Sequence, residues 1–479
     1  MEKFIFISVF IVLSLDSLNA KSDSTELPTF GDSLSGTISL QKERRLGQKF
    51  LRSIRAQAPI LDDPIIQNYL EHLVYHLAVF SELEDKNIDL VLIKNANINA
   101  FAAPGGVVGV HHGLFLHGET EHQLAAILAH ELAHLSQRHF ARRLNEGKKN
   151  SAISLAGFLA GIILAATASG DAAMAALTTS QGLAQNQLLK YSRDREAEAD
   201  RVGIKTLAQA GMDPKAMALM FEQLQKASRY AGANQAPEFL RTHPVTKSRI
   251  ADSYNQAMEY PTEKFSFRLD YQLMRTRARA ITTEHTGAEI KRFQILSRSP
   301  VEELEISGKY GLALTLTKEN RYAEALLKIK ELRDRYPLNI AFQISEAELY
   351  ESRREFEKSE KVFQNALNTS PKNYPLSVNY AETLLLAGKP GMAIKQLLPL
   401  SMTRSNDIYV WYLLAESYGL AKNIPAVHEA RAEFFALKGN FEQAIKQLGY
   451  AIPLVQNNFQ ASARIRQRIK DILKLKNEI

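Results

Sequence analysis

Residues 120–134 read Thr120-Glu-His-Gln-Leu-Ala-Ala-Ile-Leu-Ala-His130-Glu131-Leu-Ala-His134, and the apolar pattern continues to Leu144. The threonine and the glutamine three residues after it have the spacing of a capping box, so the stretch predicts a helix. Histidines four residues apart project from one helix face and can bind one metal ion. Glu131 is placed to take a proton from metal-bound water, as in zinc peptidases. The plainer alternative is a helix whose histidines face solvent or the core.

The position of a third metal ligand separates the classes of zinc peptidase. The extended metzincin pattern requires a histidine six residues after His134, where this chain has Phe140. A thermolysin-like site requires a glutamate on the next helix, but Asp171 is the only acidic residue between Glu146 and Asp194. The sequence therefore excludes both classes.

A helix rich in acidic residues supplies the missing ligand. Residues 192–203 read Ser-Arg-Asp-Arg-Glu-Ala-Glu-Ala-Asp-Arg-Val-Gly, which places Glu196 and Asp200 on one helix face. Glu196 can complete a zinc site of two histidines and one glutamate, and Asp200 can accept a hydrogen bond from a ligand imidazole and fix its tautomer. Glu198 points elsewhere and is expected in solvent. Such a helix alone is usually a solvated surface, but beside His-Glu-x-x-His it predicts a metal centre.

The segments before the histidine helix predict two helices and a small antiparallel sheet. The helices fall within residues 40–80, and strands are expected at 88–93, 98–101 and 107–110 with a turn at 104–106. The second strand contains Asn99, Ala100 and Phe101. Its edge either holds an extended substrate through main-chain hydrogen bonds or is plain sheet core.

A loop histidine follows the acidic helix in the sequence Arg-Thr-His243-Pro244, with Arg249 shortly after it. His243 can approach the metal, either to assist at the transition state or as a fourth ligand that excludes water and silences the enzyme. It can equally be a histidine that only stabilises its loop. Arg249 is expected to orient this loop or to stabilise developing negative charge.

From about Val301 the chain repeats with a period of 34 residues. Small residues recur at this spacing, in one series at Ala313, Ala347, Ala381 and Ala415 and in another at Ala325, Ser359 and Ala393. Small helix contacts with this period are typical of tetratricopeptide repeats, which form solenoids with concave surfaces for partners. An unrelated helical bundle is the alternative. The helix expected at 426–437 is half a repeat out of phase, so it should contact two neighbours.

The N-terminal sequence and the absence of cysteine indicate the cellular compartment of the protein. Residues 1–20 have a charged start, an apolar run and a small-residue exit at Ala20, which is the pattern of a secretory signal, with a membrane anchor as the alternative. Residues 21–38 are a polar, flexible leader. The chain has no cysteine among its 479 residues, which excludes disulfides, cysteine-ligated zinc and a lipid anchor on an N-terminal cysteine. We therefore expect a periplasmic protein.

Two further stretches concern membranes and nucleic acids. Residues 150–170 carry no charge and are rich in Ala, Gly and Ser, which fits a buried or interfacial helical hairpin, a peripheral membrane contact or a membrane span. The formal charge of +7 comes from 59 basic and 52 acidic residues, as on an ordinary mixed-charge surface. The basic residues within 464–476 fit a solvated terminal helix, so we expect no nucleic-acid partner.

The combination of His-Glu-x-x-His with Ser-Arg-x-x-Glu-x-Glu-Ala-Asp-x-x-Gly about sixty residues later resembles the gluzincin peptidases that include the CAAX prenyl protease and HtpX. The export signal and the repeats resemble the periplasmic, BepA-like branch of these proteases. The resemblance implies that His130, His134 and Glu196 bind one Zn²⁺ and that Glu131 is the catalytic acid and base. It also implies misassembled outer-membrane β-barrel proteins as substrates and the barrel-assembly machinery as the partner of the repeats.

The sequence thus predicts a mainly α protein in three parts after the leader. A gluzincin peptidase domain with a small antiparallel sheet covers 39–260, connecting helices cover 261–300, and a tetratricopeptide-repeat solenoid covers 301–479. The expected function is a zinc endopeptidase with a chaperone-like role in outer-membrane protein assembly. The alternative is a repeat-based chaperone or adaptor with little protease activity.

Overall fold

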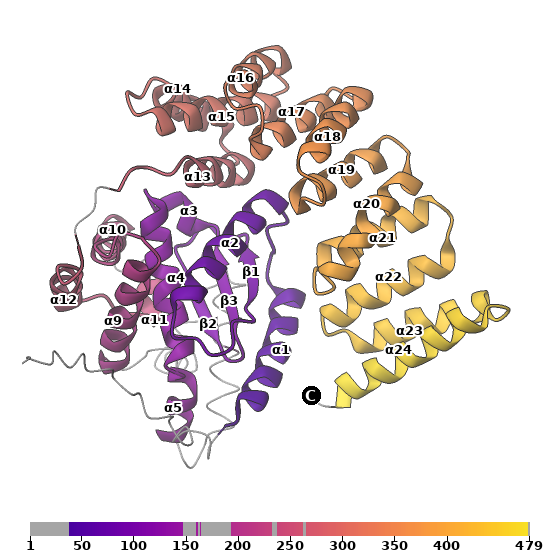
Figure 1. The fold of residues 1–479 in the computed structure, drawn as a ribbon, viewed down its shortest axis with the longest axis horizontal. Helices are drawn as coiled ribbons and strands as arrows, with labels where there is room; N and C mark the ends of the chain where they lie inside the picture. Colours follow the sequence, from indigo (N-terminus) through magenta and orange to yellow (C-terminus); the bar gives the residue numbers. More distant parts are fainter. Residues whose placement is uncertain are drawn as a thin grey trace, which may run out of the picture.

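A computed structural model of the protein describes residues 38–146, 160, 163, 193–231, 237–261 and 265–477. The expected signal peptide, the leader up to residue 37 and nearly all of 150–170 lie outside these residues. Figure 1 shows a peptidase half and a chain of helix pairs that arches over it and down one side. Within the described ranges, no helix combines the length and the apolar character needed to cross a bilayer.

The three-stranded sheet is mixed, whereas the sequence predicted an antiparallel one. The strands are β1 (Asp89–Ile93), β2 (Ala100–Ala103) and β3 (Val107–His111), in the order β1-β3-β2. The β2–β3 pair is antiparallel because a tight turn joins them, with Gly105 and Gly106 at φ of 73° and 82°. The chain reverses direction again between β1 and β2, so β1 and β3 run parallel. Both outer strands therefore have an edge without a strand partner in this sheet.

The helix that carries the two histidines forms the centre of the peptidase half. It is α4 (Glu121–Ser136), and its side chains from Glu121 to His134 are all buried. Half of the predicted capping box is present, since Thr120 accepts from Gln123 N–H, but the Gln123 side chain accepts from the N–H of Glu119 rather than from that of Thr120. The helix ends at Ser136 rather than at Leu144, and a separate helix α5 (His139–Glu146) follows.

The remaining helices of the peptidase half surround α4 and the sheet. Helices α9 and α10 pack directly on α4, α2 packs on both α4 and α9, and α12 packs on α9 and α10. Their apolar faces and the sheet form a core that continues into the solenoid. The bounds are α1 (Leu40–Gln57), α2 (Pro64–Phe80), α3 (Gly113–His117), α9 (Arg193–Gln209), α10 (Ala216–Ala231), α11 (Glu238–Thr242) and α12 (Lys247–Ala257).

The C-terminal half is a helical solenoid in which α13 packs on α15, and each helix from α14 to α23 packs on the next helix in sequence. The small residues of the first predicted series, from Ala313 to Ala415, are all buried between helices. Helix α22 packs on both α21 and α23, as its half-repeat offset predicted. The bounds are α13 (Leu269–Thr282), α14 (Thr286–Leu296), α15 (Glu302–Lys318), α16 (Tyr322–Arg335), α17 (Ile340–Ser352), α18 (Phe356–Thr369), α19 (Tyr374–Leu386), α20 (Pro390–Thr403), α21 (Ile408–Leu420), α22 (Ile424–Leu437), α23 (Phe441–Ala451), the 3-10 turn Ile452–Val455 and α24 (Phe459–Asn477).

The two halves are joined by charged contacts at separate points. The buried Arg277 on α13 lies 2.7 Å from Asp63, just before α2, and 2.6 Å from Glu348 on α17. Farther along the solenoid, Arg404 lies 2.6 Å from Glu71 on α2. The solenoid is therefore held against the peptidase half at its first helix, α13, and again between α20 and α21. The exact domain boundaries expected from the sequence stay predictions.

Candidate metal centre

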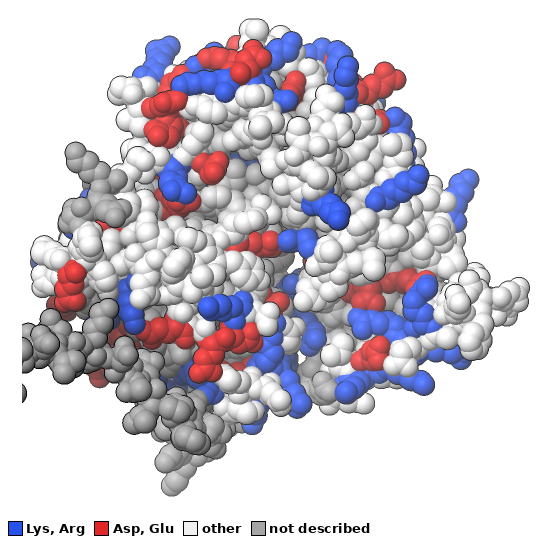
Figure 2. Space-filling view, in the orientation of Figure 1, with Lys and Arg blue, Asp and Glu red and all other residues white. Residues whose placement is uncertain are grey.

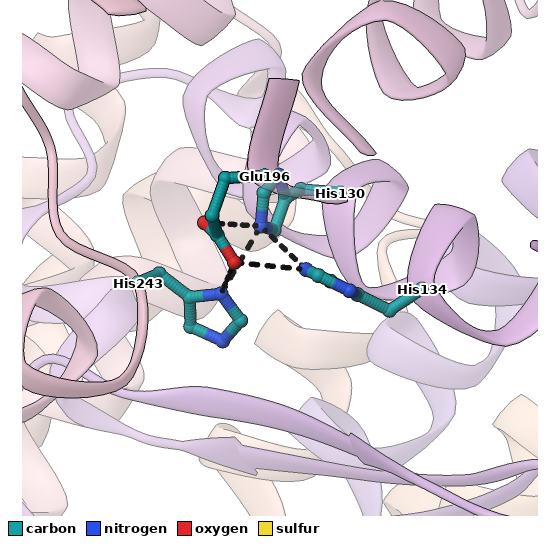
Figure 3. A group of neighbouring side chains, drawn as sticks. All are labelled: His130, His134, Glu196 and His243. Carbon is teal, nitrogen blue, oxygen red and sulfur yellow. Dashed lines mark hydrogen bonds and ion pairs between the residues drawn. The ribbon is translucent and has the colours of Figure 1, made fainter. Parts of the chain in front are cut away.

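Four buried side chains converge at the centre of the peptidase half (Figure 3). His130 and His134 come from α4, Glu196 from α9, and His243 from the residue that follows α11. One nitrogen or oxygen of each lies within 4.8 Å of the others. Nε2 of His130 and Nε2 of His134 are 3.0 Å apart, and each is 3.6 Å from a Glu196 oxygen. The structure thus brings together the three residues expected as ligands and the loop histidine.

The close packing of α9 on α4 places Glu196 beside the histidines. Gly203, one turn beyond Asp200, lies against the backbone of α4, and a Cβ there would come within 3.2 Å of His130 N and 3.3 Å of Ala129 C. A larger residue would push the two helices apart. The final glycine of the acidic motif therefore contributes to the site by allowing the approach that brings Glu196 in.

Asp200 and Arg249 lie outside the metal cluster and contact its ligand residues. Asp200 Oδ1 lies 2.9 Å from Nδ1 of His130, which places the imidazole proton on Nδ1 and leaves the Nε2 lone pair facing the other ligands. Arg249 donates to both Asp200 oxygens at 2.7 and 2.8 Å and lies 2.8 Å from Glu196. Its Nη1 also donates to Pro244 O, so it is bound to the loop of His243 as expected from the sequence.

His134 is supported by residues that the sequence analysis missed. His139 Nδ1 lies 2.8 Å from His134 Nδ1, and His139 Nε2 lies 3.0 Å from Glu198. Glu198 also receives two hydrogen bonds from Arg142 at 2.9 Å. The expectation that Glu198 is simply solvated was therefore wrong. The sequence did not indicate this contact of His139, because in one continuous helix to Leu144 its side chain would point away from the metal-binding face.

The charges of the cluster follow from burial and from neighbouring groups. Burial would raise the pKa of Glu196 and of Asp200, but hydrogen bonds and positive charge from the histidines and Arg249 outweigh it and hold both pKa values below their usual range. Burial lowers the pKa of His134 well below its usual value. The two carboxylates are therefore ionised and His134 is neutral near pH 7, which are the protonation states that metal ligands require.

Glu131 lies next to the cluster but outside its donor set. It is 1% exposed, and burial raises its pKa. The backbone of Ala102 in β2 hydrogen-bonds to it, and its Oε1 lies 3.6 Å from His243 Nε2. The side chain is thus fixed between the metal cluster and the edge of the sheet, where a proton acceptor of a peptidase must act.

His243 occupies the open side of the cluster. Its Nδ1 lies 3.0 Å from Glu196 and 3.3 Å from His130 Nε2, and its ring stacks on Phe239 with centroids 4.7 Å apart. The preceding segment also contacts the sheet, because Phe239 N–H donates to Ile98 O at 3.2 Å. This segment therefore contacts both the metal cluster and Ile98, two residues before the edge strand β2.

The edge strand β2 belongs to the sheet core and also has main-chain groups that point away from β3. The Phe101 side chain is buried over Gly109 and packs against Phe50, so it belongs to the sheet core. Hydrogen bonds to β3 alternate along β2, and the N–H and C=O of Ala100 point away from β3, toward the outer edge of the sheet. Ala100 is only 1% exposed in this closed arrangement. Substrate pairing at residues 99–101 stays a prediction.

The donor set fits zinc. Catalytic zinc sites use three protein ligands drawn from histidine and carboxylate, with a fourth position left for water. Here two imidazole nitrogens and a carboxylate oxygen converge, and each histidine is held from behind by a further hydrogen-bonding group. The cluster therefore fits one Zn²⁺ ion, and His243 brings a fourth donor atom to it.

Comparison with known proteins identifies the same kind of enzyme. The model of peptidase family M48 matches residues 64–255, which include the whole cluster. A Vibrio cholerae homologue is 34% identical over 459 residues, covering 95% of this chain and 93% of its own. The beta-barrel assembly-enhancing protease of Escherichia coli is 31% identical over 462 residues, with the same coverage.

Another relative matches less than half of this chain. The mitochondrial metalloendopeptidase OMA1 of Schizosaccharomyces pombe is 31% identical over 219 residues, covering 44% of this chain and 60% of its own. The similarity to the bacterial relatives, in contrast, extends through the solenoid. This chain is therefore a zinc metalloendopeptidase of family M48 and belongs to the beta-barrel assembly-enhancing proteases.

Proposed function

We propose that this protein is a periplasmic endopeptidase that degrades misassembled outer-membrane β-barrel proteins. The observation that carries the proposal is the similarity over 95% of the chain to proteases named for barrel assembly, which includes the solenoid as well as the metal centre. We further propose that the solenoid, whose 34-residue spacing is that of tetratricopeptide repeats, binds the barrel-assembly machinery. A peripheral membrane contact through 150–170 stays a prediction.

The chain's own residues have separable parts in peptide hydrolysis. His130, His134 and Glu196 hold the zinc, which when bound polarises the scissile carbonyl and acidifies water. Glu131 accepts the proton of the attacking water on its carboxylate and passes it to the leaving amine. Asp200 and His139 keep the two ligand imidazoles in place. The Ala100 main chain positions the substrate as an added strand once the loop of His243 has moved.

His243 keeps the resting enzyme silent in this proposal, because its ring fills the position where water must bind. We expect His243→Ala to raise the rate of casein cleavage by about tenfold or more, with zinc content unchanged. His285→Ala, a replacement of an exposed histidine before α14, is the matched control and should leave the rate unchanged. Slower cleavage by the His243→Ala protein with zinc retained would show instead that His243 assists the transition state.

The folding state of the substrate tests the proposed function. The mature protein should cleave an outer-membrane β-barrel diluted from urea, and spare the same barrel folded in detergent micelles. A folded barrel has no free strand edge, whereas an unfolded one offers extended segments. Cleavage products are followed by gel electrophoresis, with Glu131→Gln protein as the inactive control. Equal cleavage of both forms, or cleavage of casein but of neither form, would contradict the proposal.

A further inference from the structure

A cavity of about 720 Å³ lies between the peptidase half and the solenoid. One wall consists of β1 and the adjoining parts of α1 and α2, and the other consists of residues from α19 to α22. Figure 2 shows the surface hollowed along this junction. None of the four metal-cluster residues lines the cavity, so it is separate from the metal centre.

The β1 main chain presents unpaired groups to this cavity. Asp89 N–H bonds Gly106 O, and Ile93 O accepts from His112 N–H, so residues 89, 91 and 93 direct their main-chain groups toward β3. In a parallel pair the residues between them face the other way. Leu90 therefore directs its N–H and C=O to the free edge, where no described residue is seen to bond them. Its side chain is partly exposed and lines the cavity.

The chain itself already pairs with both ends of this edge. Leu61 N–H donates to Leu92 O at 3.0 Å in an antiparallel bridge between Ile60 and Ile93. At the opposite end, the Tyr75 hydroxyl donates to Ile88 O at 3.2 Å. The groups of Leu90 lie between these two contacts. This edge of β1 therefore accepts antiparallel main-chain pairing. The N–H and C=O of Leu90 remain there for hydrogen bonds to another chain.

The cavity walls indicate which side chains such a chain would carry. Tyr412 on α21 is 46% exposed and lies 6.3 Å from the Phe434 ring, while Tyr75 on the opposite wall is also 46% exposed. These rings favour aromatic or aliphatic side chains. Asp62 is exposed on the same wall, and the ion pairs found among the described residues do not include it. A basic side chain would complement this carboxylate.

We propose that this cavity is a binding site for an extended peptide, which pairs its main chain with Leu90 and carries alternating apolar and polar side chains with one basic residue. Alternation of this kind is the sequence pattern of transmembrane β-strands. The site can thus hold one strand of an unassembled barrel while another segment reaches the metal centre. That role rests on the proposed function, whereas peptide binding itself does not.

The binding test uses the full mature protein with the Glu131→Gln replacement, so that the peptide is not cut. The probe is a fluorescent peptide of sequence Thr-Tyr-Thr-Val-Lys-Tyr-Thr, and binding is measured by fluorescence anisotropy. Leu90→Pro removes only the outward N–H and should weaken binding about tenfold, since proline is tolerated on a strand edge. Leu90→Ala keeps this N–H and is the matched control, with affinity within about threefold of the parent.

Modified probe peptides test the proposal even if the Leu90→Pro protein fails to fold. Two versions of the probe carry N-methyl groups on one or the other set of alternate residues. Pairing at one edge requires that one version loses binding and the other keeps it. Equal binding of both versions, or a folded Leu90→Pro protein with parental affinity, would overturn the proposal. Peptide binding without cleavage of unfolded barrels would leave this site standing and refute the proposed function instead.

Discussion

Replacing Glu131 by glutamine is expected to lower the kcat for casein cleavage by about 10²–10⁴-fold without loss of zinc. Glutamine has nearly the same shape, so it fits the buried position beside Ala102 and leaves His130, His134 and Glu196 undisturbed. It cannot accept the proton of the attacking water. The measurements are cleavage rate and zinc content of the purified protein.

Glu196→Ala is the matched control for this experiment. It removes one of the three proposed ligands and should lower zinc content together with activity. Full zinc in Glu196→Ala protein would refute the ligand assignment, and full activity in Glu131→Gln protein would refute the catalytic one. If Glu131→Gln protein still rescues outer-membrane assembly in cells that lack the enzyme, the solenoid acts as a chaperone independently of cleavage.

Arg277→Ala is expected to destabilise the protein by about 3 kcal/mol. The arginine is 4% exposed, and its removal leaves Asp63 buried without its cation. The estimate takes the low end of the usual range for a broken buried ion pair, because its other partner, Glu348, is 28% exposed and partly screened by water. The midpoint of urea unfolding, followed by circular dichroism, measures the loss.

A surface arginine on the neighbouring helix provides the comparison. Arg292 on α14 has a side chain that is 58% exposed and lies 3.4 Å from Glu289, so Arg292→Ala should cost less than about 1 kcal/mol. Similar midpoints for the two variants would show that the Arg277 contacts contribute little to stability. A separate early transition in Arg277→Ala protein would show that the solenoid detaches before the peptidase half unfolds.

The sequence predicted those parts of the site that depend on local spacing. The two histidines and Glu131 share one helix, and Glu196 and Asp200 share another, so a period of 3.6 residues was enough to place them on common faces. Gly203 followed the same pattern, although its role in the contact between α4 and α9 became visible only in the structure.

The contribution of His139 could not be predicted because it depends on a helix break with no local cause. Arg138, at φ 46°, ends α4 without glycine or proline. Its guanidinium donates to Ile38 O, two residues before α1, and to Glu43 in the first turn of α1, and both are distant in sequence. These long-range contacts hold the turn that places His139 behind His134. The parallel β1–β3 pairing and the cavity beside β1 likewise arise from segments far apart in the chain.

The attachment of the solenoid at two points has a consequence for the catalytic helix. Its repeats contact the peptidase half through Arg277 and again through the Arg404–Glu71 ion pair, so the arch seen in Figure 1 is fixed at two separate points. The second of these points, Arg404 with Glu71, lines the cavity beside β1. Glu71 belongs to α2, which packs on α4, so this contact connects the repeats to the helix that carries Glu131.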